Sequence, residues 1–85
     1  MYYTYILINK EGSKTYTGST ADISRRLQEH NAGKNKFTGP YGPFEILHLE
    51  TFDTLKQAIQ MEKFYKGTTG RRRIKDFVES WKVKI

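Results

Sequence analysis

The sequence predicts an α+β fold, in which a small three-stranded antiparallel sheet is flanked by about three helices. The residue patterns follow the order strand, strand, helix, strand, helix, helix. Three strands with short connections pair most simply as an antiparallel sheet that packs against helices. A length of 85 residues leaves room for one domain only, so residues 1–85 are expected to fold as a single unit.

The first half of the chain predicts a hairpin followed by a helix. Residues 2–8 are rich in aromatic and β-branched types, and residues 14–18 are the expected returning strand. Gly12 favours the turn between them, because a positive φ costs glycine little. Several N-cap candidates then precede a helix expected over residues 22–31, and Gly33 stands where helices commonly end.

The second half predicts one more strand and two more helices. A loop over residues 33–43 leads into a strand over 44–50. Thr54 and Gln57 have the spacing of a capping box, so a helix is expected from there to about Lys66. The apolar face of this helix is expected to contain Leu55, Ala58, Ile59 and Met61. The last helix carries an amphipathic stripe made of Ile74, Phe77, Val78 and Trp81.

Composition excludes several classes of function. The chain has no cysteine, which rules out disulfides, thiolate zinc sites, iron–sulfur clusters and a cysteine nucleophile. Its two histidines cannot form a histidine zinc site by themselves. No apolar run approaches the roughly 20 residues that cross a membrane, and the first residues lack a signal-peptide pattern. We therefore expect a cytoplasmic protein that has no membrane partner.

Charge indicates a nucleic-acid partner. The chain carries a net charge of +6, and both halves share the excess, so the folded body itself attracts polyanions. The expected phosphate-binding residues are Lys34, Lys36, Lys63, Lys66, Arg71, Arg72 and Arg73. Phe37 and Tyr41 are available for stacking on bases. A charge run that serves only solubility is the alternative explanation.

Glu62 does not fit a purely structural interpretation of its helix. It follows Ala58 by four residues and Ile59 by three, which places a carboxylate within the apolar arc. Burying an unpaired carboxylate costs on the order of several kcal/mol. Glu62 must therefore meet a lysine or arginine, reach water at the margin of the arc, or bind a cation.

Arg26 and His30 form a second candidate group. They lie four residues apart on the first predicted helix, beside the apolar positions Ile23 and Leu27. Side chains at this spacing share a helix face and can contact one target. A solvated helix edge is the alternative.

These residues, taken with two tyrosines, resemble the GIY-YIG nuclease superfamily, and specifically its small stand-alone bacterial members. Tyr5 closes the segment Tyr3-Thr4-Tyr5, and Tyr16 begins Tyr16-Thr17-Gly18, which match the two tyrosine motifs of the family. Arg26 and Glu62 match the family's arginine and its metal-binding glutamate. The departures are Tyr3, Thr4 and Thr17 within the two motifs, and Ser19 where repair-type members carry a lysine.

The resemblance implies a metal-dependent endonuclease that hydrolyses phosphodiester bonds with low sequence specificity, DNA being favoured over RNA. Glu62 would hold one divalent cation, Mg²⁺ or Mn²⁺, and Arg26 would offset charge on the phosphoryl group. Tyr5 or Tyr16 would orient or deprotonate the attacking water, and His30 would transfer a proton or bind phosphate. Larger family members choose their sites with additional domains, so a protein partner that supplies site selection is expected.

Two alternatives to a nuclease remain open at this point. A nucleic-acid-binding module that is catalytically weak or inactive would need only the basic surface. A protein-interaction adaptor would use exposed aromatic side chains and would show no salt-sensitive binding to nucleic acid.

Overall fold

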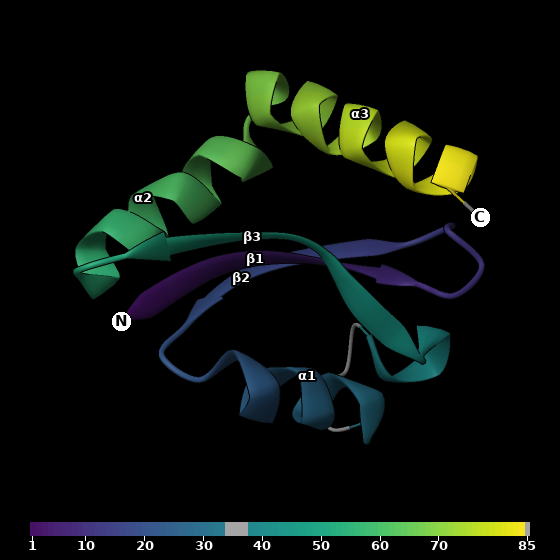
Figure 1. Cartoon of the computed structure of the whole chain (residues 1–85), viewed down its shortest axis with the longest axis horizontal. Helices are drawn as coiled ribbons and strands as arrows, with labels where there is room; N and C mark the ends of the chain where they lie inside the picture. Colours follow the sequence, from purple (N-terminus) through teal and green to yellow (C-terminus); the bar gives the residue numbers. More distant parts are fainter. Residues whose placement is uncertain (34–37, 85) are drawn as a thin grey trace.

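The computed structural model describes residues 1–33 and 38–84. Its three strands are β1 (Tyr2–Asn9), β2 (Thr15–Thr20) and β3 (Phe44–Phe52). They form an antiparallel sheet in the order β2-β1-β3, so β1 is central and β2 and β3 are edge strands (Figure 1). The predicted three-stranded antiparallel sheet is confirmed.

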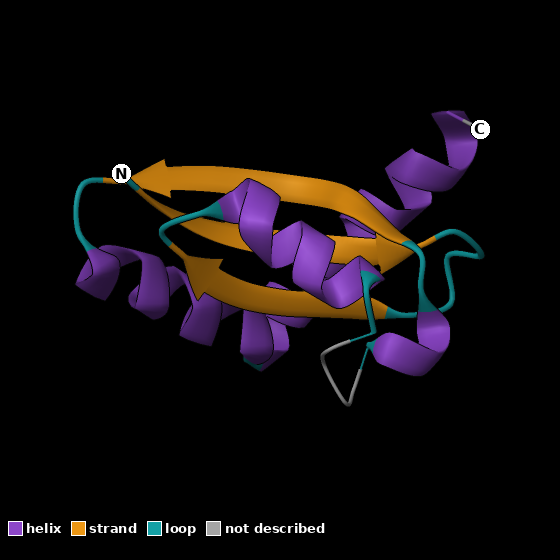
Figure 2. Ribbon diagram, turned by 90° about the horizontal axis from the view of Figure 1, so that it is seen from below, coloured by secondary structure: helices purple, strands orange, loops and turns teal. Residues whose placement is uncertain are grey.

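Three α-helices cover both faces of this sheet. Helix α1 (Ile23–Asn31) lies on one face, whereas α2 (Leu55–Lys66) and α3 (Thr68–Lys84) lie on the other (Figures 1 and 2). A short 3₁₀ turn, η1 (Gly39–Tyr41), precedes β3. The predicted α+β class is therefore confirmed. No helix within the described ranges is long and apolar enough to cross a membrane.

The central strand supplies both halves of the core. Tyr5, Leu7 and Phe44 form a buried cluster on the α1 side, which Ile23 and Leu27 complete from α1. Residues that alternate with them along β1 point to the opposite face, where Thr4 Oγ1 donates a 2.6 Å hydrogen bond to the carbonyl oxygen of Ala58 on α2. Side chains on the two faces of β1 thus anchor different helices.

Helix α1 is held at both ends. The Asp22 side chain accepts a 3.1 Å hydrogen bond from the backbone N–H of Arg25, which caps the first turn. After the last turn Gly33 adopts φ 76°, a conformation that favours glycine. The Asn31 amide accepts a 2.6 Å bond from Phe44 N–H and donates a 3.1 Å bond to Phe44 C=O, which ties the end of α1 to the start of β3.

Helix α2 begins with the predicted capping box, in which Thr54 and Gln57 exchange hydrogen bonds. The predicted apolar face is only partly correct. Ala58 is buried, but Leu55 and Ile59 are 44% and 37% exposed. The helix crosses the sheet with Ala58 and Tyr65 inward, so side chains at the edges of the predicted arc remain in contact with solvent.

Helices α2 and α3 approach each other closely at Gly70. A β-carbon at this position would overlap the backbone of Phe64 and Tyr65, so only glycine permits the contact. Helix α3 starts at Thr68, so the three consecutive arginines begin at its fourth residue. The predicted stripe is confirmed: its members are half-buried against the rest of the protein, namely Ile74, Phe77, Val78 and Trp81.

Candidate functional site

The two motif tyrosines lie on the same face of the sheet. The β1–β2 register pairs Tyr5 with Gly18 and Leu7 with Tyr16, so both phenol rings point toward α1. Their ring centroids are 6.3 Å apart, and the rings stack. Tyr5 is fully buried, whereas Tyr16 is partly exposed. Of the two hydroxyl-bearing rings, only that of Tyr16 can meet a ligand from solvent without rearrangement.

Gly18 allows the Tyr5 phenol to reach the edge of the sheet. The phenol lies directly over Gly18, and a β-carbon at that position would overlap the Tyr5 hydroxyl. The glycine of the Tyr16-Thr17-Gly18 motif therefore has a steric role, because it lets the Tyr5 hydroxyl lie against the outer strand β2.

Arg26 is held by the Tyr5 hydroxyl. Its Nε–H donates a 3.1 Å hydrogen bond to Tyr5 Oη, and Nη1 lies 3.4 Å from Glu29 Oε1. The bond to Tyr5 raises the pKa of Arg26 further above its ordinary value, so the guanidinium stays charged. Burial raises the pKa of Tyr5, although Arg26 partly opposes this, and Tyr5 stays a neutral phenol. With 38% of its side chain exposed, Arg26 remains open to a ligand.

His30 lies inside the protein, behind the tyrosines. It is 1% exposed, its Nδ1 is 2.7 Å from Thr38 Oγ1, and its Nε2 is 3.4 Å from Tyr5 Oη. Its ring centroid is also 4.6 Å from that of Tyr16. Burial, followed by the charge of Arg26, lowers the pKa of His30, which favours the neutral imidazole. This placement makes His30 a support for both phenols.

Glu62 approaches from the opposite face, on α2. Its Oε1 accepts a 2.6 Å hydrogen bond from Ser19 Oγ on β2, and its Oε2 accepts a 2.7 Å bond from Lys66 Nζ. The side chain is 22% exposed. Burial raises the pKa of Glu62, but Lys66, Ser19 and Arg26 together outweigh it, and the pKa lies below its usual value. Glu62 is thus an ionised carboxylate at the margin of the apolar arc.

Strand β2 brings the two groups together at its free edge. The Tyr5 phenol lies over Gly18 on one face of the sheet. The next residue, Ser19, donates a hydrogen bond to Glu62 on the other face. Electrostatic coupling crosses this edge: Glu62 contributes to the raised pKa of Tyr5, and Arg26 contributes to the lowered pKa of Glu62. Tyr16 adds to the raised pKa of both Tyr5 and Arg26. The anionic carboxylate and the cationic guanidinium therefore flank one strand edge.

The chemistry of the Glu62 site fits a single hard cation. Within the described ranges no three histidine, cysteine, aspartate or glutamate side chains gather around one point, so no multi-carboxylate cage exists there. An ionised carboxylate with a neighbouring hydroxyl offers oxygen donors only, and Mg²⁺ is commonly bound by one or two carboxylates plus waters and substrate phosphates. Glu62 and Ser19 are the residues that could hold such an ion.

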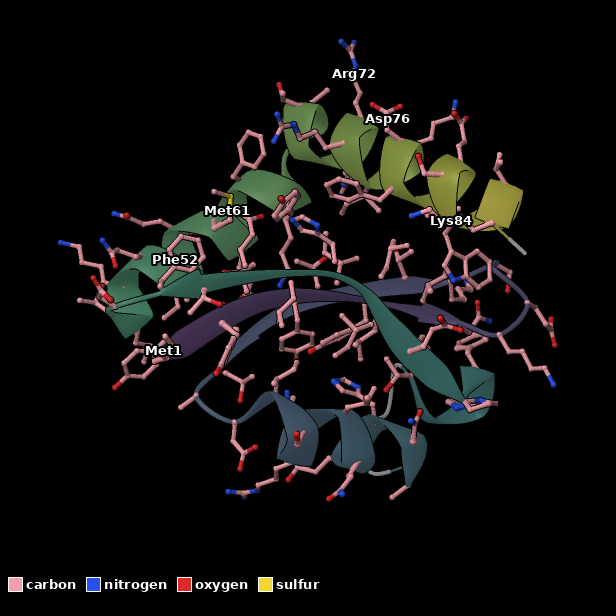
Figure 3. The ribbon with its side chains drawn as sticks, in the orientation of Figure 1. Met1, Phe52, Met61, Arg72, Asp76 and Lys84 are labelled. Atoms are coloured by element: carbon pink, nitrogen blue, oxygen red, sulfur yellow. The ribbon has the colours of Figure 1, made fainter. Side chains whose placement is uncertain are left out.

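Within the described ranges, the predicted phosphate-binding residues do not share one surface. Lys66 and Arg71 line a groove of about 510 Å³ between the β1–β2 hairpin and α3, and Lys63 is exposed elsewhere on α2. Successive residues point about 100° apart around a helix, so the three arginines diverge. Arg72 extends away from the sheet (Figure 3), and Arg73 turns toward Tyr65. Lys34, Lys36 and Phe37 lie outside the described residues.

Several supporting contacts of the site were not predicted from the sequence. Ser19 and Lys66 are the hydrogen-bond partners of Glu62, and Thr38 contacts His30. The spacing of Lys66 four residues after Glu62 on one helix is the only one of these signals visible in the sequence. The contacts of Ser19 and Thr38 join segments far apart in the chain, and only the fold reveals them.

Comparisons with known proteins show the family of the chain. The family model of the GIY-YIG catalytic domain matches residues 1–75. A UPF0213 protein of Haloquadratum walsbyi is 38% identical over 73 residues, covering 85% of this chain and 81% of that protein. A UPF0213 protein of Bacillus pumilus is 37% identical over 84 residues, covering 96% of this chain and 83% of that protein.

A solved structure supports the same relationship. The solution NMR structure of a UPF0213 protein from Bacillus halodurans superimposes with a TM-score of 0.51 at 31% identity, covering 89% of this chain and 84% of that one. The sequence motifs, the fold and these relatives agree, and the chain belongs to the GIY-YIG nuclease family.

Proposed function

We propose that this protein is a metal-dependent endonuclease that hydrolyses phosphodiester bonds, with little preference for sequence. The observation that carries the proposal is that Arg26 and Glu62 flank the free edge of β2 on opposite faces of the sheet, with the half-exposed Tyr16 within electrostatic reach of Arg26. One phosphate at this edge would face a guanidinium from one side of the sheet and a carboxylate-bound cation from the other.

Arg26 would bind the phosphate and offset negative charge that develops on it. Its Nε is occupied by Tyr5, which orients the guanidinium and leaves the remaining N–H groups for an oxyanion. Fixed donors aimed at developing charge are commonly worth about 10²–10³ in rate. Glu29 is the competing partner of Nη1, at 3.4 Å, and a phosphate would have to displace this contact.

Tyr16 and Tyr5 would have different roles. Tyr16 is partly exposed and lies within the electrostatic reach of Arg26, so its hydroxyl is the one positioned to orient or deprotonate water. Tyr5 is buried, and its hydroxyl already accepts from Arg26. We therefore assign Tyr5 and His30 to positioning, and Tyr16 to contact with the reacting water.

Glu62 and Ser19 would hold the divalent cation, Mg²⁺ or Mn²⁺. When bound, such an ion supplies Lewis-acid polarisation of the phosphate. Binding requires Glu62 to exchange its bond to Lys66 for the ion, and the lowered pKa keeps the carboxylate ionised and ready for this exchange. A single carboxylate argues for one cation rather than a pair.

The substrate would be DNA ahead of RNA, and a partner protein would supply the choice of site. Both points extend the family resemblance, in which larger members choose their sites with additional domains. Parallel cleavage assays on plasmid DNA and on RNA of equal length would test the first point directly.

Nicking of supercoiled plasmid in Mg²⁺ tests the proposed activity. We expect the Glu62→Gln and Arg26→Ala variants to lose at least about 100-fold in rate while remaining folded. Each has a matched control on an exposed helix position: Glu79→Gln removes another carboxylate, and Arg25→Ala removes the neighbouring arginine. Equal rates in all five proteins would contradict the proposal and indicate a contaminating nuclease.

A nucleic-acid-binding module without turnover is the second candidate function. The observation that favours it is the Lys66–Glu62 contact of 2.7 Å, because an internal ion pair gives Glu62 a structural role that needs no metal. In that case Glu62→Gln would leave nucleic-acid affinity unchanged or improved, and no Mg²⁺-dependent nicking would be found with any variant.

A further inference from the structure

The groove between the β1–β2 hairpin and α3 has the features of a binding channel for an extended anion. On one side it is lined by hairpin residues such as Ser13, Thr15 and Thr17, and on the other by α3. Three cations face it, Lys66 from the end of α2 and Arg71 and Lys75 from α3, and no acidic side chain is among its lining residues.

This absence of acids distinguishes the groove from two other hollows of the described surface. The hollow beside α1 is lined by Asp22 and Glu29 as well as by arginines, and the hollow between β3 and α3 contains Glu50 and Asp76. An acid next to each cation weakens attraction for a polyanion. Of these three hollows, the groove is the one whose lining is complementary in charge to a phosphate chain.

Part of the groove's lining is aliphatic. Ile74 and Val78 lie one turn apart on α3, and both are half-buried, so part of each side chain stays accessible in the groove. Arg71 and Lys75 are neighbours of these two residues along the same helix. A duplex presents its phosphates outward and keeps its base faces stacked, whereas an unpaired strand offers both phosphates and apolar base faces. Cations beside exposed aliphatic side chains fit the unpaired strand.

Lys66 connects this groove to the carboxylate site. Its Nζ is 2.7 Å from Glu62 Oε2, while its side chain is 56% exposed and lines the groove. One ammonium group is therefore shared between Glu62 and the channel. Anything that neutralises Glu62 or binds it from outside releases Lys66 to contact a strand.

We propose that this groove binds a single-stranded segment of nucleic acid adjoining the phosphate to be cleaved, and that Lys66 is the cation shared between strand and carboxylate. The inference rests on the proposed function, which it deepens by assigning the substrate class: nucleic acid with an unpaired region such as a flap or overhang. Arg71, Lys75 and the freed Lys66 contact successive phosphates, and Ile74 and Val78 contact a base.

Fluorescence anisotropy of a labelled oligothymidylate in EDTA tests the groove without turnover. Wild-type protein should bind the single strand more tightly than a duplex of equal length. Replacing Arg71 and Lys75 together by alanine removes two phosphate contacts, which lowers affinity about 25-fold at about 0.1 M salt and reduces the salt slope by about 1.4. The matched control, Lys56→Ala with Lys84→Ala, removes the same charge at exposed sites away from the groove and should retain nearly all affinity.

Two further measurements separate the contacts. An abasic strand of the same length keeps its phosphates but loses its bases, and it should bind several-fold more weakly. Glu62→Gln should raise affinity about fivefold in EDTA, because the released Lys66 gains one phosphate contact. That gain should vanish when Lys66→Ala is added to Glu62→Gln.

The inference is overturned if both double variants lose affinity equally, if duplex binds as tightly as single strand, or if polyglutamate competes as well as the oligonucleotide does. The last result would indicate an acidic peptide as the occupant. Failure of the groove and failure of the proposed function are distinguishable. Strand binding without nicking would contradict the nuclease, and nicking that depends on Glu62 without strand binding in the groove would contradict this inference alone.

Discussion

Ser19 Oγ on β2 donates a 2.6 Å hydrogen bond to Glu62 Oε1 on α2, and this contact fixes the carboxylate at the edge of the sheet. Ser19 follows Gly18, over which the Tyr5 phenol lies on the opposite face. Two consecutive residues of one edge strand thus position the two halves of the candidate site. The site depends on the register of β2 against β1.

Removing the Ser19 hydroxyl should raise the pKa of Glu62. The bond stabilises the ionised carboxylate, so Ser19→Ala shifts the pKa upward and also lowers the free energy of unfolding by about 1–2 kcal/mol. A ¹³C NMR titration of the Glu62 carboxyl carbon measures the first effect, and urea denaturation measures the second. Thr20→Ala, on the neighbouring residue, is the control. An unchanged Glu62 pKa in Ser19→Ala would contradict the assigned role.

The stability of the protein should depend on pH through Glu62. Because its pKa in the folded state lies below the usual 4.5, the carboxylate contributes stability that is fully present above pH 4.5. That contribution is lost as the pH falls through the lowered pKa. Unfolding free energies of wild type and Glu62→Gln should therefore converge in acid. A difference that stays constant from pH 7 to below pH 4 would contradict the lowered pKa.

His30 should produce a second acid-sensitive step at higher pH. Its pKa is lowered by burial, so below its usual value of 6.5 the unfolded chain binds more protons than the folded protein does. Stability is therefore complete above pH 6.5 and declines as the pH falls from there through the lowered pKa. His30→Gln should remove this decline. The expected result is a flatter curve of unfolding free energy between pH 7 and pH 5 than that of wild type, and parallel curves would contradict it.

The two motif tyrosines should respond differently to replacement by phenylalanine. Tyr16→Phe should lower the cleavage rate by about 10²–10⁴ with little effect on stability, because the lost hydroxyl acts on water. Tyr5→Phe should lower the unfolding free energy by about 1 kcal/mol, because Arg26 Nε loses its acceptor, and it should reduce the rate less than Tyr16→Phe does. Rates and urea midpoints measured on both variants decide the matter. A larger rate loss in Tyr5→Phe, without destabilisation, would reverse the assignment.

Gly70 should be sensitive to the addition of a single methyl group. Gly70→Ala places a β-carbon against the backbone of Phe64 and Tyr65, and forcing the two helices apart should cost about 1–3 kcal/mol despite the better helix propensity of alanine. Thr69→Ala, at the exposed neighbouring position, is the control and should change stability little. Thermal or urea denaturation measures both. A stabilised Gly70→Ala would show that the close approach is not required.

Much of the fold could be predicted from local patterns. The capping box of Thr54 and Gln57 and the glycine at position 33 each act within a few residues, and each is found where it was predicted. Among the several N-cap candidates before α1, Asp22 is the one that caps the helix. The exposure of Leu55 and Ile59 could not be predicted in this way. Helical spacing defines an apolar arc, but how the helix lies across a narrow sheet decides which part of that arc is covered.

The candidate site was predictable as a set of residue types but not as an arrangement. The motif spacing selected Tyr5, Tyr16, Arg26 and Glu62, which the fold places at one strand edge. The sequence did not indicate that Tyr5 is buried and Tyr16 half-exposed, because that difference depends on β2 being the outer strand. We also expected Arg71, Arg72 and Arg73 to bind phosphate together, although successive side chains on a helix point in different directions.

Paramagnetic broadening by Mn²⁺ most directly tests whether Arg26 and Glu62 serve a single phosphate site. Substoichiometric Mn²⁺ added to ¹⁵N-labelled protein should broaden the backbone signals of Ser19 and Glu62 and the side-chain Nε–H signal of Arg26, and Glu62→Gln should abolish all three effects. Broadening that persists in Glu62→Gln, or that centres on Glu50 and Asp76 in the hollow between β3 and α3, would contradict a cation site at the edge of β2.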